Sequence, residues 1–498
     1  MIILACGPPD SACGMRGLGQ VDPRVTATER IHFIVIKSYY CLTTEIDYLI
    51  YYRLLFEAGS SGPSARDRLL LSVFPGGSFR EAPVGTDRLT EGFPWGVLAD
   101  MSGLLNGIKV LDFTYLLPGP FATMLLSDLG AEVLRVESPT RIDLARLAPP
   151  FVDRDCRVSC MHAMLNRNKK SLALDLKFPE SVGIVRRLIA EEGYDVVVEQ
   201  FRPGAMDRLG LSWEALREIS PGLIYCSITG YGQSGPLRDR AGHDINYLSL
   251  AGVMSYSGRA ATGPCQMGIQ VADVGSGSNN AVIGVLAAVI HRMSTGEGQR
   301  IDVSMTDGMF PHHVVSGIRT LVGEEDPGLE TEILNGSSLY GFYETSDGGH
   351  LSFGGLEPQF LTAFLEGIGL QDWIPRLMEP GITEELKGRV AAAVRSRTRA
   401  EWEEVFREVD ACVEPVLTVS EALASEHARF RGLVAEVPGP DGAPLRQIGL
   451  PIRFSGYSPR FQWAGPALGK DTEEVLRSLG LADREISDMR SRGIIGGE

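Results

Sequence analysis

His243 is the residue in this sequence that is best suited to moving protons. It lies in the segment Gly-His-Asp-Ile-Asn-Tyr (residues 242–247), which follows a loop rich in Gly, Ser and Pro. An imidazole titrates near neutral pH, so it can act as a general acid or a general base. A histidine in a polar loop can equally be structural. His243 is therefore a candidate and not yet an assignment.

Two acidic residues stand in settings that suit the same chemistry. Asp273 precedes Gly275 and Gly277, where an apolar helix is expected to begin. Glycines at a helix start let a ligand approach closely, and free N–H groups there stabilise negative charge. Glu357 follows an expected strand, in a turn of small residues. The alternatives are a helix-capping acid for Asp273 and a solvated turn acid for Glu357.

Basic residues gather in two places along the chain. The densest run is Asn-Arg-Asn-Lys-Lys at residues 166–170, and Arg202 and Arg208 flank a second loop. Such runs can be solvated surface. On the loops at one end of a sheet, they would instead suit a phosphorylated ligand.

Alternating strands and helices are predicted to position these groups. Strands are expected at residues 108–113, 131–137, 171–176, 195–199 and 223–229, and helices at residues 121–129, 180–192 and 213–219. This alternation predicts an α/β fold with a doubly wound parallel sheet. Ligands bind beyond the carboxyl ends of the strands in such sheets. The loops after residues 113, 137, 199 and 229 are therefore the places for a site.

The chain divides into four predicted segments. Residues 101–320 form the large α/β domain, and residues 321–430 form a smaller α+β domain whose first strands flank Asp-Gly-Gly at 347–349. Residues 431–498 return to the large domain. Residues 1–100 have no clear periodic pattern, so we expect a disordered appendage or an upstream start-site error.

Composition and missing motifs exclude several classes. The 498 residues carry a net charge of −16, which argues against a nucleic-acid binder. None of the eight cysteines forms a CxxC pair, so we expect no metal site and a reducing cytoplasm. No signal peptide or uninterrupted membrane span is evident. GxxxxGK[ST], HExxH, GxSxG and GxGxxG are absent.

Nine ordered motifs give the chain a resemblance to a known superfamily. They are LNGIKVLDF (105–113), PGP (118–120), DLGAEV (128–133), RPG (202–204), GYGQSGP (230–236), AGHDINY (241–247), GEGQ (296–299), EPQF (357–360) and DACVEPV (410–416). Together they resemble the family III CoA-transferase superfamily, and within it the α-methylacyl-CoA racemases. The similarity runs from about residue 104 to residue 481.

The resemblance implies an architecture and a set of roles. It implies a Rossmann-like, CoA-binding large domain, a small domain, and an interlocked homodimer whose site lies between one chain's large domain and its partner's small domain. No metal or permanent cofactor is implied, since coenzyme A arrives as part of the thioester substrate. Asp273 matches the superfamily's essential aspartate, and His243 and Glu357 match the racemase histidine and its glutamate partner. With Asp244, they make the expected catalytic set.

Positions for CoA follow from the same resemblance. Those that match family CoA contacts, or the basic segment near its phosphates, are Arg167, Asn168, Lys169, Leu174, Leu176, Lys177, Gln200 and Arg208. Gly275 and Gly277 are expected at the thioester. Ser138 stands where the family often has an arginine, for which Arg141 could substitute.

The reading that these residues favour is epimerisation of a 2-methylacyl-CoA. Two groups on opposite faces of the α-carbon would remove and return its proton, with N–H groups of residues 275–277 holding the enolate. Two alternatives remain open. One is a CoA-transferase in which Asp273 is the nucleophile, and the other is a non-catalytic CoA-binding protein.

Overall fold

The computed structural model describes residues 32–36, 50–55, 70–73, 103–152 and 158–497. Residues Met1–Asp100 and Met101–Glu498 are separate units. In the first unit, β1 (His32–Ile36), β2 (Ile50–Leu55) and β3 (Leu70–Val73) form an antiparallel sheet in the order β1-β2-β3. The sequence did not predict these strands. The remainder of the expected disordered appendage lies outside the described residues.

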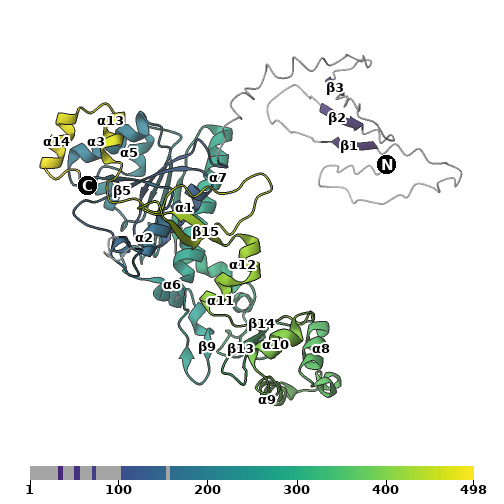
Figure 1. Ribbon diagram of the computed structural model, residues 1–498. Coiled ribbons are helices and arrows are strands. Elements are labelled where there is room, and N and C mark those ends of the chain that lie inside the picture. Colours follow the sequence, from purple (N-terminus) through teal and green to yellow (C-terminus); the bar gives the residue numbers. More distant parts are fainter. Residues whose placement is uncertain (1–31, 37–49, 56–69, 74–102, 153–157, 498) are drawn as a thin grey trace. The chain divides into compact units, whose positions relative to one another are not determined.

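A six-stranded parallel sheet forms the centre of the second unit (Figure 1). Its strands are β4 (Lys109–Phe113), β5 (Glu132–Glu137), β6 (Lys170–Ala173), β7 (Val196–Glu199), β8 (Ile224–Thr229) and β11 (Arg300–Ser304). The order is β11-β8-β7-β4-β5-β6, and every neighbouring pair is parallel. From β4 the chain adds strands on one side (β5, β6), and it then returns to add β7, β8 and β11 on the other side. The switch point therefore lies between β4 and β7, which is where doubly wound sheets bind ligands. The predicted α/β class is confirmed.

Helices cover both faces of this sheet, because its strands are apolar on both sides. On one face α3 (Pro179–Ala190), α5 (Trp213–Arg217), α13 (Thr472–Ser478) and α14 (Asp483–Ser491) pack with Leu111 and Phe113. On the other face α1 (Pro118–Asp128), α6 (Asp244–Leu250) and α7 (Asn279–Thr295) pack with Val110 and Val196. The short helices α2 (Cys160–Leu165) and α4 (Ala205–Arg208) follow β5 and β7.

A π-helix, Val271–Ser278, leads directly into α7. Together they span Val271–Thr295, a helix long and apolar enough to cross a membrane by length and composition alone. It packs against α1, β8 and β11, and Ala281 and Val285 are buried there. One side of this helix therefore packs in the core, whereas Ile283 and Ile290 on it are exposed.

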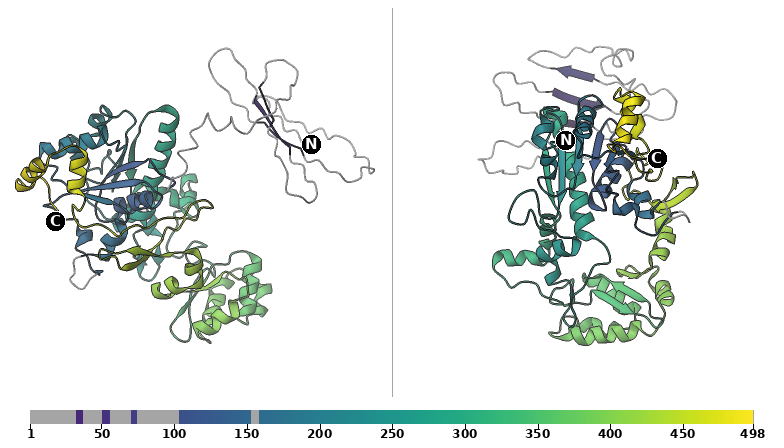
Figure 2. Two further views of the ribbon diagram at one scale, coloured as in Figure 1. Left: turned by 45° about the horizontal axis from the view of Figure 1, so that its top comes forward. Right: turned by 90° about the vertical axis from the view of Figure 1, so that its left-hand side faces the viewer.

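Residues 339–413 build a separate hydrophobic cluster (Figure 2). Strands β12 (Gly341–Glu344), β13 (His350–Phe353) and β14 (Val413–Pro415) form an antiparallel sheet. Helices α8 (Pro358–Gly367), α9 (Ile382–Val394) and α10 (Arg399–Phe406) pack on it. The rings of Phe353 and Phe364 stack with centroids 4.0 Å apart. The expected hairpin over residues 339–353 is thus present.

The chain then returns to the large sheet. It passes through α11 (Val419–Ala424), α12 (Glu426–Arg431) and the hairpin of β15 (Val434–Pro438) and β16 (Pro444–Ile448). Asp471 Oδ2 accepts the N–H of Ser171 at 2.7 Å, and Leu174 forms a β-bridge with Ile495. The last residues therefore complete the edge of the sheet at β6.

Candidate active site

A cavity of about 340 Å³ brings together three of the four expected catalytic residues. His243, Asp244 and Asp273 line it, with an apolar wall of Ile245, Leu248, Met254, Met267 and Ile269. Gln266 and Gln270 complete the lining. Acid–base groups beside an apolar wall are typical of a site that binds a small, mostly apolar substrate.

The backbone fixes the position of His243 at the start of α6. Its N–H donates to Asn246 Oδ1 at 3.0 Å, and its carbonyl accepts the N–H of Asn246 at 2.8 Å. The imidazole itself is exposed. A loop held in this way can present the ring to a ligand while the ring remains free to exchange protons.

Asp273 is half-buried in the first turn of the π-helix. Burial, and then the nearby Asp244 carboxylate, together raise its pKa to about 6 against the opposing effect of His243. Short π-helical stretches are frequent at functional sites. A carboxyl group that titrates close to neutral pH can both accept and return a proton, which is the property expected of a general acid–base group.

Asp244 holds the backbone of the other aspartate. Its Oδ1 accepts the N–H of Ala272 at 2.7 Å and that of Asp273 at 3.0 Å. Two N–H groups at the start of the π-helix therefore converge on one oxygen atom. Asp244 acts on Asp273 in two ways, since it fixes its backbone and raises the pKa of its side chain.

The expectation for the glycines needs correction. The helix begins at Val271, so residues 275–277 lie in its second half and not at its start. A β-carbon on Gly277 would lie 2.9 Å from Met305 Cγ and 3.3 Å from Pro118 Cβ, so this glycine serves packing. A β-carbon on Gly275 would meet only Val271, at 3.9 Å. Gly275 alone leaves room on that side of the helix.

Glu357 lies in the part of the chain that forms the separate hydrophobic cluster (residues 339–413), at the start of α8, and it is exposed. Its Oε2 accepts the N–H of Leu356 at 3.3 Å. Among the described residues, no hydrogen bond or ion pair joins it to His243. The expected pairing of these two side chains therefore stays a prediction about two chains.

The expectation that Arg167 and Lys169 face CoA phosphates is corrected by their burial. Both are 0% exposed. Arg167 binds Asp128 in a two-pronged ion pair, and Lys169 Nζ donates to Asp112 Oδ2 at 3.1 Å and to three further oxygens. Their cationic groups are held inside the protein, because a buried charge needs such partners.

Two more of the expected CoA positions have internal roles. Asn168, with a φ of 61°, accepts the N–H of Gln462 and donates to Arg460 O, so it clasps the returning chain. Leu174 is 1% exposed. In contrast, Leu176 is half-buried and Lys177 is exposed directly after β6.

The switch point of the sheet carries the remaining expected positions. Gln200 follows β7, and its side chain bridges to the loop after β4 by accepting from Gly119 N–H and donating to Tyr115 O, both at 2.9 Å. A β-carbon on Gly119 would lie 2.6 Å from Gln200 Oε1, so this close approach requires glycine. Arg208, the last residue of α4, is exposed.

Sequence reasoning named Arg141, Arg202 and Arg208 but missed Arg238, which adds to the positive charge at this edge. The guanidinium groups of Arg208 and Arg238 both lie within 4 Å of where a β-carbon of Gly204 would be. Arg141 and Arg202 both lower the pKa of Tyr115, although burial leaves it raised. The sequence could have pointed to Arg238 too, because it stands in the loop after β8, and the fold class predicts ligand contacts in such loops.

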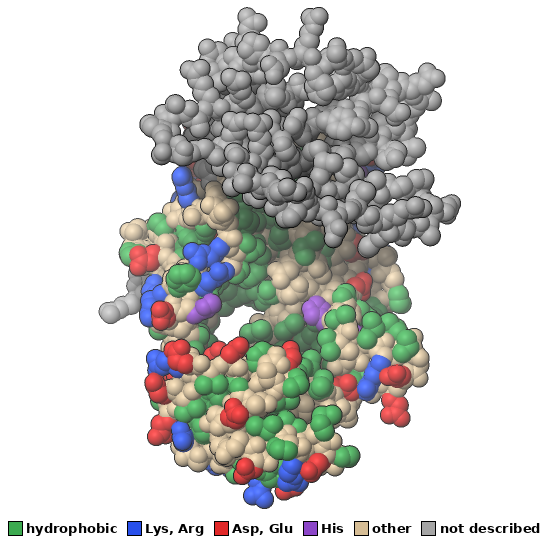
Figure 3. Space-filling model, turned by 90° about the vertical axis from the view of Figure 1, so that its right-hand side faces the viewer, with side chains coloured by type: hydrophobic (Ala, Val, Ile, Leu, Met, Phe, Trp, Pro, Cys, Tyr) green, Lys and Arg blue, Asp and Glu red, His purple; other side chains and the backbone are tan. Residues whose placement is uncertain are grey.

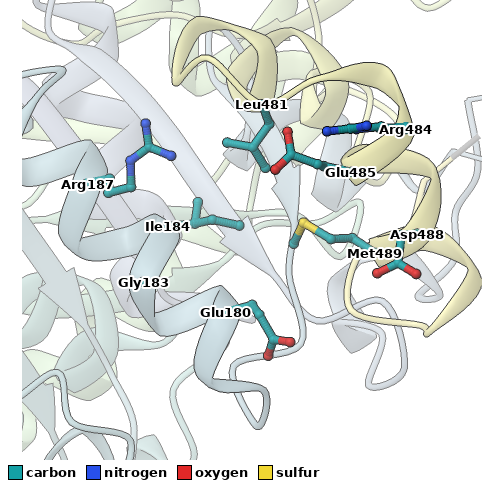
Figure 4. Close-up of a pocket in the computed structure, with 9 residues that line it drawn as sticks. All are labelled: Glu180, Gly183, Ile184, Arg187, Leu481, Arg484, Glu485, Asp488 and Met489. Atoms are coloured by element: carbon teal, nitrogen blue, oxygen red, sulfur yellow. The ribbon is translucent and has the colours of Figure 1, made fainter.

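Within the described residues, no group of three or more His, Cys, Asp or Glu side chains is arranged to hold a metal ion. A larger hollow of about 610 Å³ lies between α3 and α14 (Figure 4). Its floor is Ile184, Leu481 and Met489, and two of its rim residues, Glu180 and Arg187, pair with Arg492 and Glu191. These rim charges neutralise one another, so this hollow is not the candidate active site.

Hydrophobic side chains remain exposed around a hollow on one face of the molecule (Figure 3). Exposed apolar side chains in the described residues include Ile283, Ile290 and Met293 on α7, and Phe310, Val314 and Leu321 in the segment after it.

Comparisons with known proteins show the family of this chain. The family model described as CoA-transferase family III matches residues 105–472. Human alpha-methylacyl-CoA racemase is 36% identical over 394 residues, which cover 78% of this chain and 97% of the human protein. Human succinyl-CoA:glutarate CoA-transferase is 31% identical over 409 residues, covering 80% and 91%. The crystal structure of a CAIB/BAIF family protein from Brucella suis has a TM-score of 0.65 at 29% identity, covering 76% of this chain and 100% of that one.

Proposed function

Because the chain belongs to CoA-transferase family III, we propose that it is an epimerase that interconverts (2R)- and (2S)-2-methylacyl-CoA thioesters. The observation that carries this proposal is that one cavity holds both His243 and Asp273. Epimerisation through a planar intermediate needs two acid–base groups, one for each face of the reacting carbon. Similarity to the racemases of human and mouse, at 36% identity, supports the same choice.

The reaction removes the α-proton from one face of the α-carbon and adds a different proton to the other face. In one direction His243 takes the proton, and the electrons of the C–H bond form the carbon–carbon double bond of an enolate. Asp273, in its protonated form, then delivers a proton to the opposite face, and the reverse reaction exchanges the two roles. The pKa of about 6 at Asp273 suits this, because both of its forms are populated near neutral pH.

The enolate oxygen requires donors that are already in place. The N–H groups of Ala272 and Asp273 converge on a single oxygen atom, which is Asp244 Oδ1 in this structure. We infer that the thioester oxygen takes this position in the reactive complex and that Asp244 moves aside. This replaces the earlier expectation that residues 275–277 supply the donors.

The CoA moiety of the substrate would lie along the carboxyl edge of the sheet. Arg208, Arg238, Arg141 and Arg202 supply positive charge for its phosphates, and the exposed Lys177 extends this charge towards β6. An overall acidic chain can bind such an anion through a local cluster of this kind. No resident cofactor or metal is part of the proposal.

We further propose that the working form is a homodimer. The exposed apolar residues around α7 would be covered by a second copy, and Glu357 of one copy would then orient His243 of the other. A cytoplasmic location is proposed because Cys160, Cys226, Cys265 and Cys412 are free thiols.

A CoA-transferase is the second candidate, because the half-buried Asp273 also faces the cavity as a nucleophile would. Relatives at 31–32% identity are named succinate–glutarate CoA-transferases. In that reaction, the carboxylate would attack the thioester carbonyl and expel the CoA thiolate, leaving an acyl anhydride.

One experiment separates the two candidates. A panel of 2-methylacyl-CoA thioesters is incubated with the protein in deuterium oxide and then with hydroxylamine. Deuterium at the α-carbon without a trapped adduct supports the epimerase. A hydroxamate at Asp273, found by mass spectrometry, together with no α-deuterium, would replace it by the transferase.

A further inference from the structure

We propose that Tyr247 is a positioning residue that sets the place of His243 in the cavity. The inference rests on the proposed function, in which His243 exchanges the α-proton. Tyr247 is four residues after His243 on α6, and it is 5% exposed, so it is not itself in contact with the bulk solvent.

Two glycines make room for the Tyr247 ring. A β-carbon on Gly230 would lie 2.6 Å from Cε1 of this ring, and one on Gly242 would lie 2.7 Å from the same atom. Any larger residue at either position would displace the ring or the loop. The ring is thus pressed between the loop after β8 and the peptide that precedes His243.

The hydroxyl group completes the attachment. Tyr247 Oη donates to the carbonyl oxygen of Gly242 at 2.5 Å, and Gly242 is the residue directly before His243. The carbonyl of His243 in turn accepts the N–H of Asn246 at 2.8 Å. The peptide on each side of the histidine is therefore anchored, which fixes the direction of its Cα–Cβ bond.

The environment keeps the hydroxyl protonated. Burial raises the pKa of Tyr247, and the negative charge of Asp273 raises it further. The hydroxyl therefore remains a donor throughout the pH range of the reaction.

Tyr247→Phe removes this hydroxyl and leaves the ring. We expect α-deuterium exchange to fall about tenfold in kcat with KM within twofold of the wild type, since a small misplacement of a reacting group is costly. Tyr231→Phe is the matched control. Tyr231 packs edge-on against Tyr247 at 5.3 Å, but the structure gives its hydroxyl no hydrogen bond to a described residue. Its exchange rate should stay within twofold.

A double variant separates positioning from a general loss of structure. His243→Ala should retain slow exchange through Asp273 on the other face. If Tyr247 acts through His243, adding Tyr247→Phe to this variant should change the remaining rate by less than twofold. A further tenfold loss, or a Tyr247→Phe variant as fast as the wild type, would overturn the inference alone. A wild-type protein that exchanges no α-proton would overturn the proposed function, and this inference with it.

Discussion

Two groups of charged residues in this protein both contain aspartates, but these aspartates have opposite environments. In the cavity, His243 is exposed and Asp273 is half-buried, without a cation bonded to its carboxylate among the described residues. Just before β6, Lys169 is buried against Asp112 and Arg167 is buried against Asp128. Burial raises the pKa of Asp273, whereas Lys169 and Arg135 outweigh burial and lower that of Asp112. At Asp128 burial outweighs Arg167, so its pKa is raised even though its carboxylate is paired. We conclude that what distinguishes the cavity group is the lack of a bonded cation, which leaves Asp273 available for chemistry.

The most severe test of this contrast is Asp273→Asn. The variant keeps the shape of the side chain but can neither accept nor return a proton. We expect α-proton exchange to fall by about 10³-fold, within the range for an acid–base group, with little change in the urea midpoint. Asp372→Asn, at an exposed position within residues 339–413, is the control and should be fully active. Normal exchange in Asp273→Asn would remove this residue from the mechanism.

Lys169→Met tests the other side of the comparison. It leaves the Asp112 carboxylate buried without its cation, which should cost about 3–5 kcal/mol in the free energy of unfolding. Activity per folded molecule should remain. Lys170→Met is the control, because this exposed neighbour pairs with Glu474 at 3.2 Å and should contribute less than about 1 kcal/mol. Equal losses in both variants would contradict the contrast.

Asp273 and a buried histidine, His162, should respond to acid with opposite sign. His162 is 2% exposed, and its Nδ1 lies 3.0 Å from Asn166 Nδ2. Burial, and then Arg146, lower the pKa of His162 to about 3, so only the unfolded state binds its proton between pH 6.5 and 3. Its contribution to stability is lost as the pH falls through this window, on the order of 2–3 kcal/mol by pH 4. His162→Gln should therefore lose less stability in acid than the wild type.

The raised pKa of Asp273 has the opposite effect on stability, because the folded state binds the proton more tightly than the unfolded state between pH 3.8 and 6. Relative to Asp273→Asn, the wild type should gain stability as the pH falls. Urea unfolding at pH 7, 5.5 and 4 measures both slopes.

Asp244→Asn gives the smallest expected effect. The amide can still accept the N–H groups of Ala272 and Asp273, but it no longer carries the charge that helps raise the pKa of Asp273. The acid limb of the pH–rate profile should move to lower pH. The rate at neutral pH should change by less than about tenfold, since one pKa unit corresponds to only 1.36 kcal/mol. A limb that moves to higher pH would show that Asp244 does not act through its charge.

Much of the large sheet could be predicted, since its strands are short apolar runs bounded by glycine turns. Pattern alone could not supply the order of those strands or their pairing with residues near the C-terminus. The first three strands were missed because residues 32–73 lack a regular alternation that would separate strands from loops.

The sequence predicted the acidic residues and the histidine of the candidate site, but not which basic residues are buried in ion pairs. His243, Asp244 and Asp273 were predicted together, and they line one cavity. Arg167 and Lys169 were expected near the CoA phosphates because a run of basic residues is usually exposed, whereas both are buried. Their carboxylate partners, Asp128 and Asp112, lie 39 and 57 residues away in the sequence. Only the three-dimensional structure shows such pairing.

The pairing of β6 with the returning chain has a consequence for biosynthesis. Asp471 and Thr472 bind the backbone of Ser171 and Ala173 across about 300 residues of sequence. The edge of the large sheet can close only after the ribosome has made nearly the whole chain, including residues 339–413. Until then β6 presents an unpaired, aggregation-prone edge. A nascent chain that stalls before residue 471 would therefore be expected to depend on chaperones, even though most of its sheet is already synthesised.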